Sequence, residues 1–201
     1  MAESGELIIE GLLTTWDCHG CVNLSPMGAR LNVVGEGLEL RPFKTSRSYT
    51  NLMETNSGVF HITDDVHLIA RAAIGDVHPM AELLMITGTT AYRLKDTCRW
   101  YLVALDEAMQ EGPRATLEMK IQQSGRVRDF AGFNRAKHAV IEAAILATRV
   151  GILPDEEIWN QFTVLEPWIT KTGGIPERDA FALLKHTIVE KMNHSESFRK
   201  Q

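Results

Sequence analysis

Residues 40–51, Leu-Arg-Pro-Phe-Lys-Thr-Ser-Arg-Ser-Tyr-Thr-Asn, are the stretch around which this 201-residue chain is organised. They begin in a short apolar strand predicted over 38–43 and run into a helix predicted from Ser46. The stretch combines cations, hydroxyls and one aromatic ring: Arg41, Lys44, Arg47, Thr45, Ser46, Ser48, Thr50 and Tyr49. Hydroxyl side chains ahead of a helix leave backbone N–H groups free to point outward.

A helix N-terminus with nearby cations favours an anion, because its free amides and the helix dipole both carry positive charge. In a chain whose formal net charge is −5, this local basic cluster is distinctive. The pattern predicts a phosphate-binding turn. The alternative is a solvated basic turn in which Ser or Thr only caps the helix.

The composition limits the classes of protein that fit. Hydrophobic residues make up 44% and charged residues 23%, which is ordinary for a soluble globular protein. The acidic balance does not favour binding to nucleic acid. No apolar run reaches the roughly 18–20 residues that cross a membrane. The acidic N-terminus shows no signal peptide, and three cysteines do not suggest a disulfide framework, so we expect a cytoplasmic protein.

The first two thirds of the chain are rich in short β-forming segments separated by turns. Strands are predicted over 7–16, 21–34, 38–43, 59–63, 93–107 and 115–123. Short helices are predicted over 46–55 and 66–74, the second capped by Asp64-Asp65 and ended by Gly75. Six strands with mostly short links predict a mainly β fold with added helices, built on a six-stranded antiparallel split β-barrel.

From Asn134 the apolar period changes to that of helices. Asn134 is a predicted N-cap, Pro154 begins a second helix that Pro167 should kink or shorten, and 177–192 forms the last helix. We therefore expect a barrel domain over 1–130 and a C-terminal helical subdomain over 131–201. Three helices bury little on their own, so they are expected to pack on the barrel or on a dimer partner.

Two groups of residues have the side chains of a redox or metal site, but neither pattern favours such a site. Cys18-His19-Gly20-Cys21 is a CxxC motif, but it lies across a hairpin turn with no second CxxC and no helix start at Cys18, which favours incidental turn cysteines. A second group of His and Asp residues lacks a defined ligand spacing, so no metal is expected: His61, Asp64, Asp65, His67 and His78. Dinucleotide, Walker and nucleophile-elbow motifs do not occur.

The chain resembles the flavin-reductase-like, FMN-binding split-barrel superfamily, which includes pyridoxamine-phosphate-oxidase-like proteins. The resemblance rests on 14–20, which matches a first hairpin of the type Thr-x-Asp-x-x-Gly, on 23–30 and on Thr45-Ser46-Arg47. More narrowly, nearly the whole chain resembles an uncharacterised archaeal and bacterial family of flavoproteins. That narrower resemblance rests on 25–28, 40–43, 49–52, 63–66 and 134–137.

The resemblance implies FMN at the interface of a homodimer. It implies that Arg30, Lys44 and Arg47 neutralise the phosphate, and that the backbone of 27–29 approaches the flavin ring. Arg41 and Asn51 are implied near the ribityl chain or ring edge. The full implied cofactor-binding set is Ser25, Met27, Gly28, Ala29, Arg30, Arg41, Phe43, Lys44, Thr45, Ser46, Arg47, Tyr49 and Asn51.

The expected activity is that of an FMN-dependent oxidoreductase with a small-molecule substrate or an electron donor such as NAD(P)H, because the flavin itself carries the electrons. No catalytic side chain is identified. The alternatives are a non-catalytic flavin- or ligand-binding dimer and a deazaflavin-dependent reductase. Vitamin-B6 chemistry is disfavoured because helices replace the C-terminal substrate-binding strand of that pattern.

Overall fold

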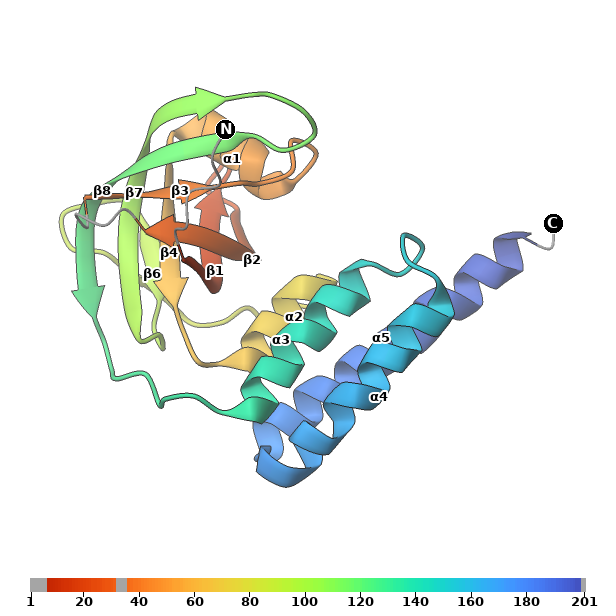
Figure 1. Ribbon diagram of the computed structural model, residues 1–201. Coiled ribbons are helices and arrows are strands. Elements are labelled where there is room, and N and C mark those ends of the chain that lie inside the picture. Colours follow the sequence, from red (N-terminus) through yellow and green to blue (C-terminus); the bar gives the residue numbers. More distant parts are fainter. Residues whose placement is uncertain (1–6, 32–35, 200–201) are drawn as a thin grey trace. The chain divides into compact units, whose positions relative to one another are not determined.

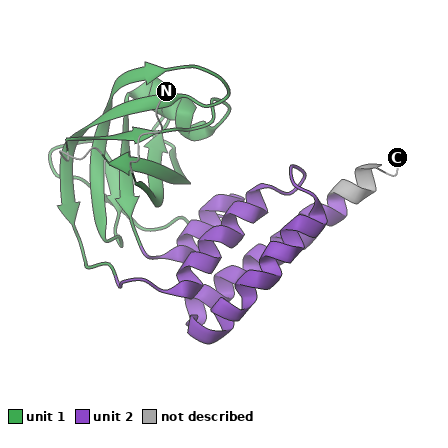
Figure 2. Ribbon diagram, in the orientation of Figure 1, with its two compact units in different colours: residues 1–63, 79–130 green, residues 64–78, 131–201 purple. Residues whose placement is uncertain are grey.

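The computed structural model describes residues 7–31 and 36–199, with the side chains of 195–199 left out. The chain forms two compact units (Figure 2). The first contains Met1–Thr63 and Pro79–Phe130, and the second contains Asp64–His78 and Ala131–Gln201. The sequence placed 64–78 with the barrel, whereas the structure groups this segment with the C-terminal helices.

The first unit is a closed barrel of six antiparallel strands in the order β1-β2-β3-β8-β7-β4 (Figure 1). The strands are β1 (Ile8–Trp16), β2 (Val22–Leu31), β3 (Gly37–Leu40), β4 (Ser57–Ile62), β7 (Arg99–Met109) and β8 (Thr116–Arg126). The predicted six-stranded antiparallel barrel is confirmed. The expected continuation of the second strand to Val34 lies outside the described residues.

The barrel interior is filled by side chains that alternate along the strands. Its core includes Leu13, Ala29, Leu38, Leu40, Leu52, Phe60, Val103, Ala115, Leu117 and Met119. Each of these is at most 2% exposed. Small residues such as Ala29 and Ala115 alternate with large ones, which lets the layers of a narrow barrel interlock.

Helix α1 (Arg47–Thr55) closes one side of the barrel and contacts mainly β1 and β2. Leu52 is fully buried, and Tyr49 and Met53 pack against the same core. The helix ends at Asn56, which adopts the left-handed conformation with φ of 53° and donates its backbone N–H to the Leu52 carbonyl. Asn tolerates that conformation better than most residues do.

A two-stranded hairpin, β5 (Leu83–Met85) and β6 (Tyr92–Leu94), was not predicted. It covers part of the outer surface of the barrel. Ile86 and Ala91, between its strands, pack against Val59 and Leu102 on that surface. The strand predicted over 93–107 is therefore two strands, separated by the turn at 95–98, because Leu94 pairs with the hairpin rather than with β4.

The second unit consists of α2 (Val66–Ile74), α3 (Arg135–Thr148), α4 (Asp155–Thr172) and α5 (Ile175–Arg199). The predicted caps are present: Asp65 accepts from the Leu68 N–H, and Asn134 accepts from the N–H groups of Ala136 and Lys137. Helix α3 carries small buried alanines and contacts both α4 and α5, which carry larger buried side chains, among them Phe162, Phe181 and Leu184.

The sequence predicted that Pro167 kinks or shortens α4; the helix continues through it to Thr172, so the predicted shortening is wrong. Burial of Leu165 and Ile169 on either side of the proline explains this, since tertiary packing outweighs one lost backbone hydrogen bond. No helix in the described part of the chain is both long and apolar enough to cross a membrane.

Candidate functional site

The turn ahead of α1 leads into two backbone amides that the helix itself cannot satisfy. The Ser46 N–H donates to the Phe43 carbonyl at 2.9 Å, and Ser46 Oγ accepts from the Tyr49 N–H at 3.2 Å. Ser46 is therefore the N-cap, as the sequence predicted. The Arg47 and Ser48 amides occupy the first two helical positions, where no carbonyl of the helix can accept from them. The start of α1 thus carries the partial positive charge of a helix N-terminus.

This turn docks against the hairpin that joins β7 to β8. The Lys44 N–H donates to the Pro113 carbonyl at 3.1 Å, and Phe43 forms an isolated β-bridge with Arg114. The Arg114 guanidinium lies 3.8 Å above the Phe43 ring and donates to the Arg41 carbonyl at 2.9 Å. Arg114 is thereby held in place beside the turn, although the sequence analysis did not select it.

Four cations belong to this turn and to the hairpin that it contacts: Arg41, Lys44, Arg47 and Arg114. Arg41, Arg47 and Arg114 are exposed, while Lys44 is half-buried and donates from Nζ to the Gln110 carbonyl at 2.5 Å. Among residues 7–31 and 36–199, none of the four makes an ion pair with a carboxylate. Positive charge gathered beside the amides of a helix start attracts an anion, although the charge of Arg47 also acts on the Asp17 carboxylate.

The turn between β1 and β2 also lies within electrostatic reach of α1. Asp17 Oδ1 accepts from the N–H groups of Cys21 and His19, both at 2.9 Å. The Cys21 hydrogen bond, then that of His19 and the charge of Arg47, lower the pKa of the Asp17 carboxyl despite some desolvation. Cys18 and Cys21 are free and exposed in this turn. Asp17 thus shapes the turn and stays ionised.

A buried polar layer fastens α1 to the barrel. Ser48, 2% exposed, accepts from Asn23 Nδ2 at 3.1 Å and lies 2.6 Å from Ser25 Oγ. Asn51 donates from Nδ2 to Thr15 Oγ1 at 3.0 Å. Ser25 and Asn51, both predicted to bind cofactor, therefore have partners within the protein. Buried polar groups must be satisfied in this way, and here they fix the position of the helix start.

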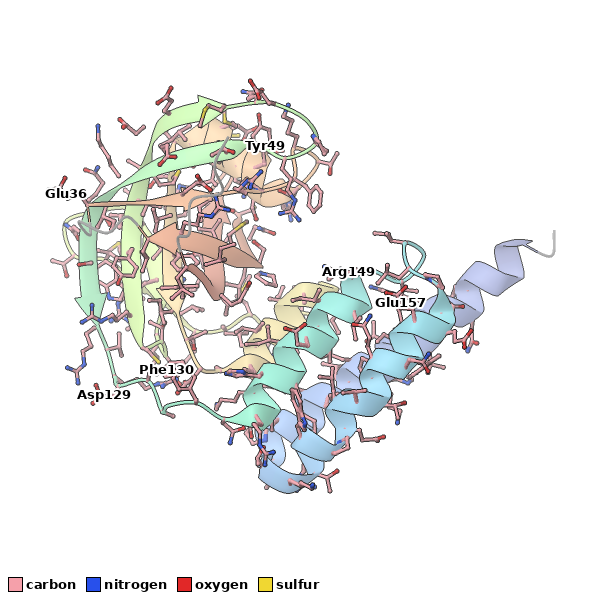
Figure 3. The ribbon with its side chains drawn as sticks, in the orientation of Figure 1. Glu36, Tyr49, Asp129, Phe130, Arg149 and Glu157 are labelled. Carbon is pink, nitrogen blue, oxygen red and sulfur yellow. The ribbon has the colours of Figure 1, made fainter. Side chains whose placement is uncertain are left out.

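Of the remaining predicted residues, some lie on β2 and α1, and the others lie in the basic turn. Met27, Ala29 and Tyr49 pack against the barrel core, with Tyr49 labelled on α1 in Figure 3. Arg30 donates to Glu39 at 2.8 Å across the β2–β3 pair. Gly28 stands beside β1, where an added Cβ would lie 2.9 Å from the side chain of Ile8. Of the thirteen predicted residues, those from 41 to 47 form the basic turn, with Thr45 exposed among them.

His61 is fully buried on β4 and has both ring nitrogens engaged. The Leu94 N–H donates to Nε2 at 3.0 Å, so the proton resides on Nδ1, which lies 3.2 Å from the Leu12 carbonyl. Burial lowers the pKa of His61 to about 3. The imidazole is a neutral structural group with no free nitrogen for proton transfer. In the described part of the chain, no three or more His, Cys, Asp or Glu residues gather as metal ligands.

Comparison with known proteins gives the following matches. The family model described as "Protein of unknown function (DUF447) N-terminal domain" matches residues 9–128, and the model "Protein of unknown function (DUF447)" matches 134–186. No curated protein matched by sequence.

Among solved structures, an FMN-bound DUF447 protein from Methanosarcina mazei is 22% identical, with a TM-score of 0.79 over 90% of this chain and 95% of that one. Flavin reductase HpaC in complex with NADP+ is 12% identical, with a TM-score of 0.54 over 64% of this chain and 84% of its own. A flavoredoxin from Methanosarcina acetivorans is 14% identical, with a TM-score of 0.51 over 63% and 74%. At these identities the matches establish a shared fold.

Proposed function

This chain belongs to the DUF447 family, and on that premise we propose that it is a flavoprotein whose barrel binds FMN. The observation that carries the proposal is the group of four cations, none in an ion pair within the described residues, on the turn that leads into α1 and on the hairpin that this turn contacts. A phosphate monoester fits this arrangement, since it is a compact dianion that accepts several hydrogen bonds. The FMN-bound relative of the same fold supports the choice of FMN over other phosphate esters.

Arg47 and Arg114 are assigned to the phosphate, together with the amides of Arg47 and Ser48. Both guanidiniums are exposed, and the contacts of Arg114 with Phe43 and Arg41 hold it in position. Lys44 adds positive charge from its site against Gln110. Arg30 is not assigned, because its ion pair with Glu39 across the β2–β3 pair already neutralises it.

We also propose an oxidoreductase that accepts electrons from NAD(P)H. When bound, FMN supplies the hydride and electron transfer. The protein would bind the phosphate and orient the ring. The state of His61 supports this division of roles, because this buried base has both ring nitrogens engaged and none free for proton transfer. The fold shared with flavin reductases supports the reaction class by analogy.

Absorbance and anaerobic reduction test the proposal directly. The purified protein is expected to carry, or to bind on titration, a flavin with the absorbance of FMN, and NADH or NADPH is expected to bleach it without oxygen. A protein that binds no flavin would contradict the cofactor assignment. A bound flavin that no donor reduces would indicate a non-catalytic flavin-binding protein. A deazaflavin absorbance spectrum would identify a deazaflavin, rather than FMN, as the cofactor.

We propose in addition that the protein is a homodimer, as its resemblance to the split-barrel flavoproteins implies. Light scattering during size-exclusion chromatography measures the mass in solution. A mass twice that of the 22.5 kDa chain is expected. A monomer that still binds FMN would contradict the dimer and leave the cofactor assignment intact.

A further inference from the structure

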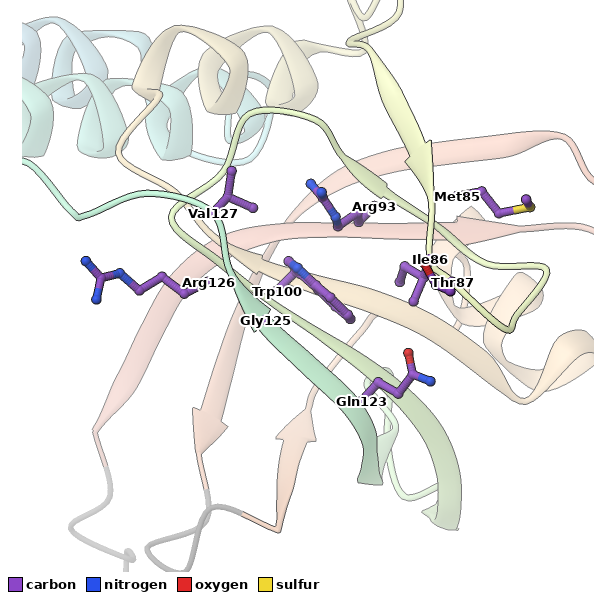
Figure 4. A pocket seen from close by; sticks show the side chains of 9 residues that line it. All are labelled: Met85, Ile86, Thr87, Arg93, Trp100, Gln123, Gly125, Arg126 and Val127. Carbon is purple, nitrogen blue, oxygen red and sulfur yellow. The ribbon is translucent and has the colours of Figure 1, made fainter.

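A second candidate site lies on the outer surface of the barrel, in a hollow of about 400 Å³ between the β5–β6 hairpin and the β7–β8 pair (Figure 4). It is lined by Met85, Ile86, Thr87, Arg93, Trp100, Gln123, Gly125, Arg126 and Val127. All of these residues belong to the first unit. The hollow adjoins the start of β7 and the end of β8, whereas the basic turn contacts Arg114 in the hairpin at the other ends of these strands.

The two places are therefore separate. Trp100 and Met109 stand nine positions apart on β7, which corresponds to about 30 Å along a strand. A ligand the size of one nucleotide cannot fill the hollow and contact the basic turn at once. The hollow requires its own explanation.

The indole of Trp100 lies over the backbone of Gly125, the residue on β8 with which Trp100 is directly paired. A Cβ on Gly125 would lie 2.6 Å from Nε1 and 2.7 Å from both Cε2 and Cζ2 of the indole. Three ring atoms at nearly equal distance show that the glycine allows this edge of the indole to lie against the sheet. The indole is thus held as a rigid aromatic wall of the hollow, in a place where a side chain on residue 125 would displace it.

Arg93 contributes a cation to the wall of the hollow. Its guanidinium carbon lies 6.0 Å from the centre of the Trp100 ring, near the outer limit of a cation–π contact and well beyond the 3.8 Å between Arg114 and Phe43. Nη1 donates to the Leu94 carbonyl at 2.9 Å, and no carboxylate of the described residues pairs with it. Arg126, by contrast, is ion-paired with Asp129, and in Figure 4 its side chain extends away from Trp100.

The remaining wall is mixed in chemistry. Ile86 supplies an apolar surface, and Gln123 carries an amide that can donate and accept. An aromatic wall, a cation and one adaptable amide are the elements that recognise a flat ring bearing an acidic group.

We propose that this hollow binds a planar aromatic anion, with the ring against Trp100 and the acidic group at Arg93. Its volume lies within the range of small-molecule sites and suits a nucleoside monophosphate. An aromatic carboxylate also combines a flat ring with an acidic group, so experiment must distinguish it from a nucleoside monophosphate. The proposal does not depend on FMN binding at the basic turn.

Calorimetric titration of the full-length protein with AMP, adenosine, inorganic phosphate and benzoate distinguishes these sources. AMP that binds more tightly than adenosine or phosphate supports a nucleotide, and benzoate that binds in place of AMP supports an aromatic acid. No binding of any of them at millimolar concentration overturns the proposal. Repeating the AMP titration with saturating FMN tests whether the sites are separate, because competition between the two ligands would overturn a second site.

Two substitutions locate the binding. Trp100→Leu, which keeps an apolar group against Ile86, is expected to weaken AMP about tenfold, because stacking on an aromatic ring is lost. Arg93→Gln is expected to weaken AMP about tenfold and to leave adenosine unaffected, because only the charged hydrogen bond is removed. Trp100→Phe should restore much of the affinity.

Arg99→Gln is the matched control, since Arg99 is exposed, precedes Trp100 on β7 and does not line the hollow. It should bind AMP as the unaltered protein does. Equal affinity in all four variants, with unchanged denaturation midpoints, would contradict the assignment of the site.

Discussion

His61 and Leu94 are joined by a hydrogen bond of 3.0 Å from the Leu94 backbone N–H to the Nε2 atom of the imidazole. Because Nε2 accepts, the proton is on Nδ1, which faces the Leu12 carbonyl at 3.2 Å. One side chain of β4 therefore connects the backbone of β1 to that of the β5–β6 hairpin. This arrangement exists only while the imidazole is neutral, since a protonated ring could not accept from Leu94.

Acidification should destabilise the protein through His61. Burial lowers its pKa to about 3 in the folded state from 6.5 when unfolded, so between these values the unfolded state binds more protons. The free energy of unfolding must then fall as the pH falls from 6.5 towards 3. The contribution lost by about pH 4.5 is about 3 kcal/mol, from two units of 1.36 kcal/mol each. Urea denaturation measured across this range would show the decline.

A His61→Gln variant provides the reference for that experiment, because the Gln amide can both donate and accept but does not titrate. Carboxylates titrate in both proteins, so the difference between them isolates His61. The gap in unfolding free energy between protein and variant should narrow as the pH is lowered. Parallel curves for the two proteins would show that His61 is not held neutral.

Loss of the Ser46 hydroxyl should loosen the start of α1. Ser46→Ala removes the acceptor for the Tyr49 N–H and is expected to cost about 1 kcal/mol of unfolding free energy. Thr45→Ala removes an exposed hydroxyl one position earlier that caps nothing, and it should cost much less. Thermal or urea denaturation measures both, and equal losses would show that the hydroxyl of Ser46 is not the cap.

A methyl group on Gly125 should displace the Trp100 indole. Gly125→Ala places Cβ within 2.7 Å of three ring atoms, so the ring must move away from its packing against the cluster that includes Val59 and Ile86. The free energy of unfolding is expected to fall by about 1–3 kcal/mol, as it does at other overpacked sites. Gln123→Ala, at an exposed position on the same strand, is the control. A fully stable Gly125→Ala protein with unchanged tryptophan fluorescence would refute the contact.

The ion pair between Lys137 and Glu177 should stabilise the helical unit more than a surface pair does. Burial raises the pKa of Glu177, but the hydrogen bonds from Lys137 Nζ and the Gly174 N–H outweigh it, and the net pKa is lowered. The carboxylate therefore stabilises the fold above its unfolded pKa, and this contribution is lost on acidification. Glu177→Gln is expected to cost about 2 kcal/mol at neutral pH.

The exposed pair of Lys185 and Glu166 is the comparison. Glu166→Gln is expected to cost less than about 0.5 kcal/mol, since both side chains are about half exposed and water screens the pair. Urea denaturation at neutral pH compares the two variants. If Glu166→Gln lowers the free energy of unfolding as much as Glu177→Gln does, burial of the Lys137–Glu177 pair does not increase its contribution to stability.

Local features of the fold were predictable from the sequence. Ser46, Asp65 and Asn134 each cap the helix that follows, because a cap depends on residues only two or three positions away. The strands of the barrel were predictable for the same reason, since alternation is a local pattern. Pro167 shows the limit of local rules, because packing of α4 carried the helix through a residue that normally ends one.

Contacts between distant residues were not predictable. Arg114 joins the basic turn only because its hairpin pairs it with Phe43, 71 positions earlier. The ion pair of Arg30 with Glu39 was also not predictable, because it depends on the β2–β3 register that places the two residues opposite each other. The β5–β6 hairpin was not predicted, because strands of three residues are too short to show an alternation of apolar and polar residues.

The central claim is that the start of α1 binds the phosphate of FMN, and titration of FMN and riboflavin into charge variants tests it most directly. Arg47→Ala and Arg114→Ala are each expected to weaken FMN about tenfold, because each removes a charged hydrogen bond, while riboflavin, which lacks the phosphate, should be unaffected. Arg99→Ala, an exposed cation at the far end of β7, should change neither. Equal loss of FMN and riboflavin in the Arg47 and Arg114 variants, or no loss of either, would contradict the claim.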